Sequence, residues 1–390
     1  MPTPDHVTSD GASPVNFIAG DESAAPPSPG MALCLSGGGY RAMVFHLGAL
    51  IRLNEAKLLQ KISRISSVSG GSIAAGRLGL CWKKLGFQNG VASMLMSEVI
   101  DPVRKLAGKT IDAESIIGGI LLPGSISDRI VSAYKDYLFG EATLQALPAD
   151  KEGPRFVINA TNVQSGALWR FSKPFMADYL VGMVSNPEVS LAFAVAASSA
   201  FPPVLSPARL HLDHGSFIPD PKCPLQKEPF TTEIVLTDGG VYDNLGLETA
   251  WKRYKTVLVS DGGGKIEPQP EPKSDWARHA YRVLDVIDNQ VRSLRKRQLI
   301  EAFKNQNDDH DGTYWSIRTH IKDYGLPDAL PCPEERTLEL AMTPTRLKRL
   351  EPGYQDRLIN WGYAVCDAAI RKHVDKTLPK PAGFPYPGGV

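Results

Sequence analysis

Three short segments of the sequence combine small residues with a serine or an aspartate in positions that could catalyse acyl transfer. The first is Ser67-Val-Ser69-Gly-Gly71, which follows an apolar run. A nucleophilic serine between a strand and a helix needs small neighbours, because the chain must turn sharply there without clashes. The N-terminal end of the following helix favours the anion that develops during attack. Ser69 is therefore a candidate nucleophile, and an ordinary serine-rich turn is the alternative.

The second segment also follows an apolar run and contains Gly37, Gly38, Gly39 and Arg41. Successive glycines let backbone N–H groups converge on one point, as an oxyanion hole requires. The arginine, one turn into the next helix, could brace this loop or hold a phosphate. The same segment satisfies the dinucleotide pattern G-x-G-x-x-A ending at Ala42, with Glu55 as the available ribose-binding acid. An oxyanion hole and a nucleotide-binding turn are thus both open.

The third segment is Asp238-Gly-Gly-Val-Tyr-Asp-Asn-Leu-Gly246. An aspartate that ends a strand and precedes glycines is exposed yet rigidly placed, as a general base must be. Asp261, followed by three glycines, makes the same case from the next strand. The sequence therefore presents two candidate bases, one of which we expect to be structural.

The surrounding elements must bring these segments together. Apolar runs predict strands over residues 31–36, 62–68, 155–160, 234–237 and 256–260. Helical patterns cover residues 40–57, 72–85, 189–199 and 276–303, and the segment 343–373 closes the fold. Strands alternating with helices predict an α/β fold with a largely parallel sheet covered on both faces. Ligands in such sheets bind at the carboxyl ends of the strands, where the glycine turns fall.

Taken together, these motifs resemble the patatin-like phospholipases. Ser36–Ala42 is similar to that family's oxyanion motif, Val68–Ser72 to its nucleophile elbow, Ala197–Pro203 to its small-residue block and Asp238–Gly240 to its catalytic D-G-[AG]. The ordered resemblance runs from about residue 31 to 250 and continues more weakly through Gly362-Tyr363. Ser67 departs from the family pattern, which has glycine at that point.

The resemblance implies a three-layer α/β sandwich and a serine hydrolase with a Ser–Asp dyad and no catalytic histidine. The sequence shows no EF-hand loop, and no metal or other cofactor is expected. Ser69 would attack an ester carbonyl and Asp238, rather than Asp261, would take its proton. Backbone amides of the loop Gly37–Gly39, supported by Arg41, would stabilise the oxyanion of an acyl-enzyme pathway. The implied substrates are glycerophospholipids, with other esters, thioesters or acyl transfer as alternatives. A nucleotide-binding module and an inactive membrane-associated module are alternatives from other classes.

Composition and charge argue against several other classes of protein. Of 390 residues, 43 are Lys or Arg and 42 are Asp or Glu, so the net charge of +1 disfavours a mainly electrostatic nucleic-acid binder. Five scattered cysteines argue against a disulfide framework. The sequence shows no secretory signal and no apolar run that could span a membrane, which predicts a cytoplasmic protein with peripheral membrane contact allowed. Oligomeric state is left open.

The domain organisation follows from composition as well. Residues 1–30 are rich in Pro, Ser, Ala, Asp and Gly and are predicted to be a flexible, disordered leader. Residues 31–375 form the expected catalytic domain, with a motif core at 31–265 and a helical extension at 266–375. Residues 376–390 remain as a tail.

Four further features each have two interpretations. Residues 116–123 are apolar and form either a lid or a buried connection. Two clusters of basic residues could bind anionic head groups or simply form a solvated helix face. Their members are Arg292, Arg295, Lys296, Arg297, Arg346, Lys348 and Arg349. The short run His211–His214 resembles part of a metal site but fits a surface loop better. Four histidines follow Asp238 and leave a Ser–Asp–His triad open, namely His279, His310, His320 and His373.

Overall fold

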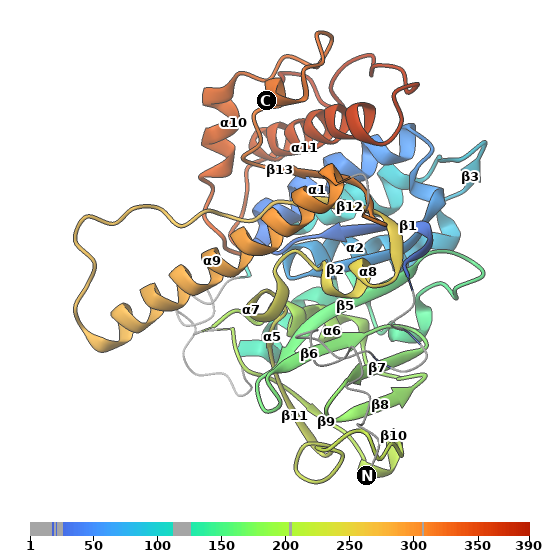
Figure 1. The fold of residues 1–390 in the computed structure, drawn as a ribbon, viewed down its shortest axis with the longest axis vertical. Coiled ribbons are helices and arrows are strands. Elements are labelled where there is room, and N and C mark those ends of the chain that lie inside the picture. The colour runs from blue at the N-terminus through green and yellow to red at the C-terminus, as the bar shows by residue number, and fades with distance from the viewer. Residues whose placement is uncertain (1–17, 19–20, 22–25, 112–125, 203–204, 306–307) are drawn as a thin grey trace, which may run out of the picture.

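The computed structural model describes residues 18, 21, 26–111, 126–202, 205–305 and 308–390. Their centre is a parallel sheet with five strands in the order β5-β2-β1-β12-β13. These strands are β5 (Arg155–Asn162), β2 (Ile62–Val68), β1 (Ser28–Leu35), β12 (Tyr254–Asp261) and β13 (Asp311–Ser316). Figure 1 shows the sheet extending from β13, beside α11, to β10 at the opposite end of the molecule.

Beyond β5 the sheet becomes antiparallel. It continues through β6 (Ala167–Phe171), β7 (Phe175–Asp178), β8 (Gly182–Ser185) and β10 (Phe217–Ile218). The four residues between β5 and β6 are too few for a parallel crossover, so they form a hairpin. β11 (Glu233–Asp238) pairs antiparallel with β5 and β9 (Ala208–His211), while β3 (Phe87–Gln88) and β4 (Val91–Ala92) form a separate hairpin. The expected parallel sheet is confirmed at the centre, but the predicted strand 234–237 runs antiparallel.

Helices cover both faces of the sheet, which makes the three-layer arrangement. Alternate side chains of β1 show the two faces: Leu33 and Leu35 join one apolar cluster, and Ala32 and Cys34 join the other. The first cluster contains α1 (Gly39–Glu55), α2 (Gly70–Cys81), α6 (Leu191–Ser198) and α11 (Pro352–His373). The second contains α8 (Glu248–Trp251) and the C-terminal end of α9 (Trp276–Lys304). The remaining helices are α3 (Asp101–Ala107), α5 (Ile126–Tyr134), α7 (Gly240–Asp243) and α10 (Glu334–Ala341).

The first strand begins three residues before its predicted start at residue 31. β1 starts at Ser28, and two earlier residues, Ile18 and Asp21, are buried. The tail also packs on the domain, since the Asn360 amide on α11 donates to the carbonyl oxygens of Tyr386 and Gly389. Residues near both ends of the described chain therefore pack on the body of the fold.

The predicted lid segment, residues 116–123, lies outside the described residues. Within the described part of the chain, no helix has the length and the apolar character needed to cross a bilayer.

Candidate active site

Ser69 occupies a sharp turn between β2 and α2. Its backbone angles, φ 51° and ψ −120°, are ones that residues with a side chain rarely adopt, at a cost of order 1–3 kcal/mol. The following glycines allow this turn to lie close to the glycine loop, residues 37–39. A Cβ atom on Gly70 would come within 2.1 Å of the Gly39 carbonyl oxygen, and one on Gly71 within 2.3 Å of the Leu35 carbonyl oxygen. The strained serine is thus held directly against the glycine loop.

Ser69 and Asp238 meet because two strands approach each other along one edge of β5. β2 runs parallel to β5 up to the pair Val68–Asn159. β11 comes from the opposite direction and ends at the pair Asp238–Ala160. Because the partners on β5 are consecutive residues, the ends of β2 and β11 lie next to each other. Both candidate residues line the same pocket at this point.

The Asp238 carboxyl group is almost fully buried, with 2% of the residue exposed. Its Oδ1 accepts a hydrogen bond of 2.7 Å from the Gly240 amide, and its side chain also contacts that of Ser69. Burial raises the pKa of Asp238 to about 7, although the interactions with Gly240 and Ser69 act in the opposite direction. A carboxyl group with a pKa in this range can accept a proton and return it at neutral pH.

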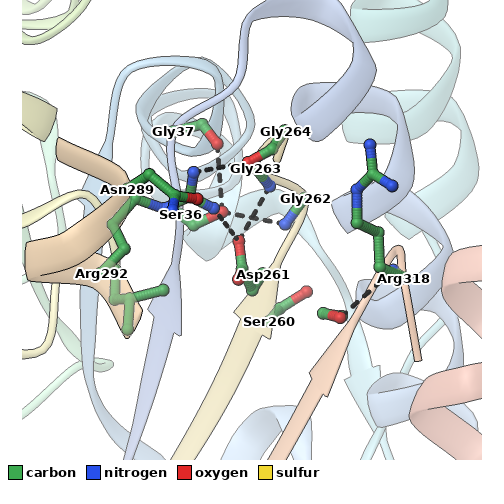
Figure 2. A network of polar contacts seen from close by, with 12 residues as sticks. Ser36, Gly37, Ser260, Asp261, Gly262, Gly263, Gly264, Asn289, Arg292 and Arg318 are labelled. Carbon is green, nitrogen blue, oxygen red and sulfur yellow. Dashed lines mark hydrogen bonds and ion pairs between the residues drawn. The ribbon is translucent and has the colours of Figure 1, made fainter. Parts of the chain in front are cut away.

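Asp261, the other candidate base, is held in a separate network (Figure 2). Its carboxylate accepts hydrogen bonds from the Tyr314 hydroxyl at 2.7 Å and the Gly263 amide at 2.8 Å, and it pairs with Arg292 at 3.4 Å. Burial alone would raise the pKa of Asp261, but Arg292 and these hydrogen bonds hold it below its usual value. Asp261 does not line the pocket that holds Ser69. The geometry therefore favours Asp238 as the partner of Ser69.

The glycine loop presents backbone amides beside Ser69. Gly38 and Gly39 both have positive φ angles, 141° and 59°, and both line the pocket. No described residue accepts a hydrogen bond from either amide. The Gly37 amide is used differently, because it donates to the Asn244 carbonyl oxygen at 3.0 Å. Of the three predicted oxyanion donors, Gly38 and Gly39 are thus the two whose N–H groups remain available.

Arg41 lies behind the glycine loop and outside the pocket lining. Its Nε donates to the Gly262 carbonyl oxygen at 2.9 Å, and a terminal nitrogen donates to the Thr343 carbonyl oxygen. Burial and the nearby Arg292 lower the pKa of Arg41 to about 10, which leaves it charged at neutral pH. These contacts give Arg41 the bracing role that the sequence offered as one of two alternatives.

Glu55, the acid required by the nucleotide-binding alternative, ends α1. At 1.5 Å per residue, the 17-residue helix places it roughly 24 Å from the glycine loop, where it accepts a hydrogen bond from Tyr363. The described structure therefore does not bring Glu55, the ribose-binding candidate, to the glycine loop.

A group of serines supports the nucleophile turn, and sequence reasoning identified none of their contacts. The Ser198 hydroxyl accepts a hydrogen bond of 2.9 Å from the Ser69 amide, and it lies 2.9 Å from the Ser72 hydroxyl. Ser72 in turn donates to Ser67 at 3.0 Å. A hydroxyl at position 67 is therefore compatible with the elbow, because it has buried hydrogen-bond partners. The supporting serines lie in two segments that the sequence had indicated, the elbow (Ser67 and Ser72) and the small-residue block (Ser198), but their contacts depend on how these segments pack.

Asn244 is a second residue that sequence reasoning did not single out. Its carbonyl oxygen accepts a hydrogen bond from the Gly37 amide, and the residue lines the pocket. Its Oδ1 lies where Cβ atoms on Gly37 and Gly240 would collide with it, at 2.3 and 2.7 Å. Asn244 thus ties the glycine loop to the turn that follows Asp238.

The candidate histidines lie away from this pocket. His310 stacks on Trp251 with ring centroids 3.7 Å apart, His320 pairs with Glu334, and His279 lies on the exposed side of α9. His373 ends α11. No histidine is among the pocket-lining residues of the described chain. The geometry thus supports a serine–aspartate pair rather than a triad.

The buried His46 supports the site from behind. Burial lowers the pKa of His46 to about 4, so the ring is neutral at physiological pH. Its Nε2–H donates to the Ser36 carbonyl oxygen at 3.0 Å, and Nδ1 accepts from the Ser260 hydroxyl at 2.8 Å. Figure 2 shows that Ser36 also links Gly37 and Gly262, so this histidine helps to join the ends of β1 and β12.

The pocket itself has a volume of about 520 Å³. Its lining combines apolar residues, Phe201, Leu205, Ile266 and Leu347, with charged residues, Lys265, Glu267, Arg282, Asp285, Asp288, Arg292 and Arg346. Two of the predicted basic residues, Arg292 and Arg346, are therefore at the pocket. Within the described chain, no group of three or more His, Cys, Asp or Glu residues is arranged to hold a metal ion.

Comparisons with known proteins bear on the fold and on the family. The chain matches human GIVD cytosolic phospholipase A2 in fold, with a TM-score of 0.50 and 12% identity over 86% of this chain and 58% of that one. VipD from Legionella pneumophila matches with a TM-score of 0.36 and 16% identity, over 88% of this chain and 66% of that one. The chain thus spans less than two thirds of the human enzyme's length, and no curated protein matches it by sequence. The family model for patatin-like phospholipase matches residues 33–251, more than half of the chain, and the protein belongs to this family.

Proposed function

We propose that the protein is a lipid acyl hydrolase that cleaves carboxylic ester bonds of glycerophospholipids with Ser69 and Asp238. The observation that carries the proposal is the contact between these two side chains in one pocket, with burial raising the pKa of Asp238 to about 7. An aspartate with this pKa can act as the base without a histidine. The family match supports the same reaction class.

The reaction would proceed through an acyl-enzyme. Asp238 takes the hydroxyl proton as Ser69 Oγ bonds to the ester carbonyl carbon, and the Gly38 and Gly39 amides donate to the resulting oxyanion. The tetrahedral intermediate collapses, and the leaving alkoxide, a lysophospholipid, receives the proton from Asp238. Water then attacks the acyl-enzyme with Asp238 again as base. This second step releases the fatty acid and returns the proton to Ser69.

The lining of the pocket supports an amphiphilic substrate. Apolar side chains such as Phe201 and Leu205 suit an acyl chain, whereas Lys265, Arg282 and Asp285 suit a charged head group. A pocket with both kinds of lining favours a phospholipid over a purely neutral lipid.

Product analysis by mass spectrometry tests the proposal. Wild type, Ser69→Ala and Asp238→Asn would each be incubated with a mixed extract of phospholipids and neutral lipids. We expect fatty acid and lysophospholipid only from wild type, and labelling by a fluorophosphonate probe that the Ser69→Ala variant lacks. Equal product formation by wild type and Ser69→Ala would refute the assignment. Release of fatty acid from neutral lipids alone would retain the mechanism and reject the phospholipid substrate.

A further inference from the structure

Helix α9 presents apolar side chains to solvent. Its only buried residues, Leu299 and Ala302, lie near its C-terminal end. Figure 1 shows the N-terminal half of the helix projecting from the body of the molecule. Apart from Tyr281, which lines the pocket, the large exposed apolar residues on it are Trp276 (86% exposed), Val283, Leu284 (59%), Val286, Ile287 (53%), Val291 and Leu294.

These residues form a stripe opposite the pocket. Trp276, Val283, Ile287 and Leu294 are spaced by seven, four and seven positions, which places them on one side of a helix. The residues of α9 that line the pocket occupy the other side, and they are Tyr281, Arg282, Asp285, Asp288, Asn289 and Arg292. An ordinary surface helix turns its apolar side inward and its charged side outward. The N-terminal part of α9 has the reverse orientation.

Hydrogen bonds fix this orientation. Arg292 Nη1 donates to the Gly264 carbonyl oxygen at 2.6 Å, and its other terminal nitrogen pairs with Asp261. Nearly three turns toward the N-terminus, Arg282 donates a hydrogen bond to the Glu267 carbonyl oxygen at 2.6 Å. Rolling the helix to bury its apolar side would break these contacts. The apolar side is therefore held outward.

Within the length of the stripe the exposed charges are basic, and the exposed acids Asp275 and Glu301 lie at the two ends of the helix. From residue 276 to 298, every exposed side chain of α9 is apolar, uncharged polar, histidine or basic. The two acids in this part, Asp285 and Asp288, are partly buried on the pocket side. Arg278, Lys296 and Arg297 are exposed, and of these Arg278 pairs with Asp275 at 2.7 Å. Apolar side chains flanked by basic residues, with no acid between them, are complementary to an anionic lipid surface.

We infer that this exposed side of α9, which we call the α9 face, docks on an anionic lipid surface. The inference rests on the proposed lipid hydrolase function for its choice of a lipid surface over a second copy of the chain. Docking would set the pocket next to the lipid, because the same helix lines it with its other side. Two exposed aromatic residues that line the pocket, Phe201 and Tyr281, would lie at the entrance.

Vesicle sedimentation tests the inference with the full chain. The double variant Leu284→Glu/Ile287→Glu charges the α9 face but touches no pocket residue, and glutamate preserves helix propensity. Wild type should sediment with vesicles of phosphatidylcholine and phosphatidylserine in equal amounts, and less with phosphatidylcholine alone or at high salt. The variant should bind the mixed vesicles at least about tenfold more weakly, because two inserted apolar side chains are replaced by charges.

A control variant, Ile218→Glu/Leu338→Glu, adds the same charges at exposed apolar positions outside α9 and should bind vesicles as wild type does. All three proteins should hydrolyse p-nitrophenyl butyrate equally, which shows that the variants fold. Unchanged vesicle binding by the α9 variant, or no binding by wild type, would overturn the inference. So would a wild-type dimer in gel filtration that the α9 variant dissociates. Equal ester turnover by Ser69→Ala and wild type would instead refute the proposed function and leave the binding result intact.

Discussion

The carboxyl group of Asp238 is buried beside the Ser69 hydroxyl, and its protonation state should control the pH dependence of the proposed reaction. In the proposed reaction, only the deprotonated carboxylate can take the Ser69 proton. Because burial raises the pKa of Asp238 to about 7, activity should fall as the pH drops below that value. We expect kcat/KM for a soluble ester to rise with pH and reach half its plateau near pH 7. A profile that stays flat from about pH 5 to pH 9 would exclude Asp238 as the base.

The same group affects stability. The pKa of Asp238 is about 7 in the folded protein, whereas an unfolded aspartate has its ordinary pKa of 3.8. Between these values the folded state binds more protons, so stability decreases as the pH rises. Asp238→Asn should therefore be more stable than wild type at pH 8, by up to about 4 kcal/mol for a shift of roughly three pKa units. Urea unfolding at pH 8 and at pH 4 tests this, since the gain should vanish at pH 4.

Between elements, the critical contact is that of the glycine loop with the segment before α11. A Cβ atom on Gly39 would lie 2.7 Å from the Arg346 carbonyl oxygen, and Gly39 has a φ of 59°. Gly140 has nearly the same φ, 55°, but no atom within 4 Å of the Cβ position. With a ψ of −140°, Gly140 is also in a region that residues with a side chain rarely adopt, so Gly140→Ala should cost about 1–3 kcal/mol from its backbone alone. Gly39→Ala should cost more, because contact with the backbone adds to this strain.

The two glycine variants should also differ in catalytic activity. Gly39→Ala should lower kcat for a soluble ester at least about tenfold, because a misplaced oxyanion donor loses transition-state stabilisation. Gly140→Ala should leave kcat unchanged once the protein is folded. Equal stability and activity of the two variants would show that the glycine loop adapts without loss.

At the same scale, much of the secondary structure follows from local sequence. β2 was predicted over its observed residues, and the limits of β12 and α9 differ from prediction by one or two residues. Apolar runs and glycine turns set these limits locally. The direction of β11 could not be predicted in this way, because it depends on pairing with β9 and β5.

For the whole molecule, a buried acid joins the segment before β1 to the sheet. Asp21 accepts hydrogen bonds from Arg64 on β2 and Arg155 on β5, and its backbone contacts Arg253. Burial alone would raise the pKa of Asp21, but these arginines, Arg64 foremost, lower it. Asp21→Ala would leave Arg64 charged and buried.

We expect Asp21→Ala to lower the free energy of unfolding by about 3–5 kcal/mol, the usual cost of removing one partner of a buried pair. Glu141→Ala, which removes an exposed partner of Lys135, should cost less than about 1 kcal/mol. Chemical denaturation of both variants compares them directly. Equal losses would mean that Asp21 contributes no more than a surface ion pair.

The sequence by itself determined the family resemblance, the α/β class and the candidates Ser69, Asp238 and the glycine loop. These depend on residue types in short segments, where apolar runs, small residues and turns act locally. Only the tertiary structure decides which of the two aspartates, Asp238 or Asp261, contacts Ser69. Asp238 reaches Ser69 because β2 and β11 end at consecutive residues of β5, while Asp261 is neutralised by Arg292 from a distant helix. Strand pairing, burial and the orientation of α9 all depend on contacts between segments far apart in the chain, and no local pattern encodes them.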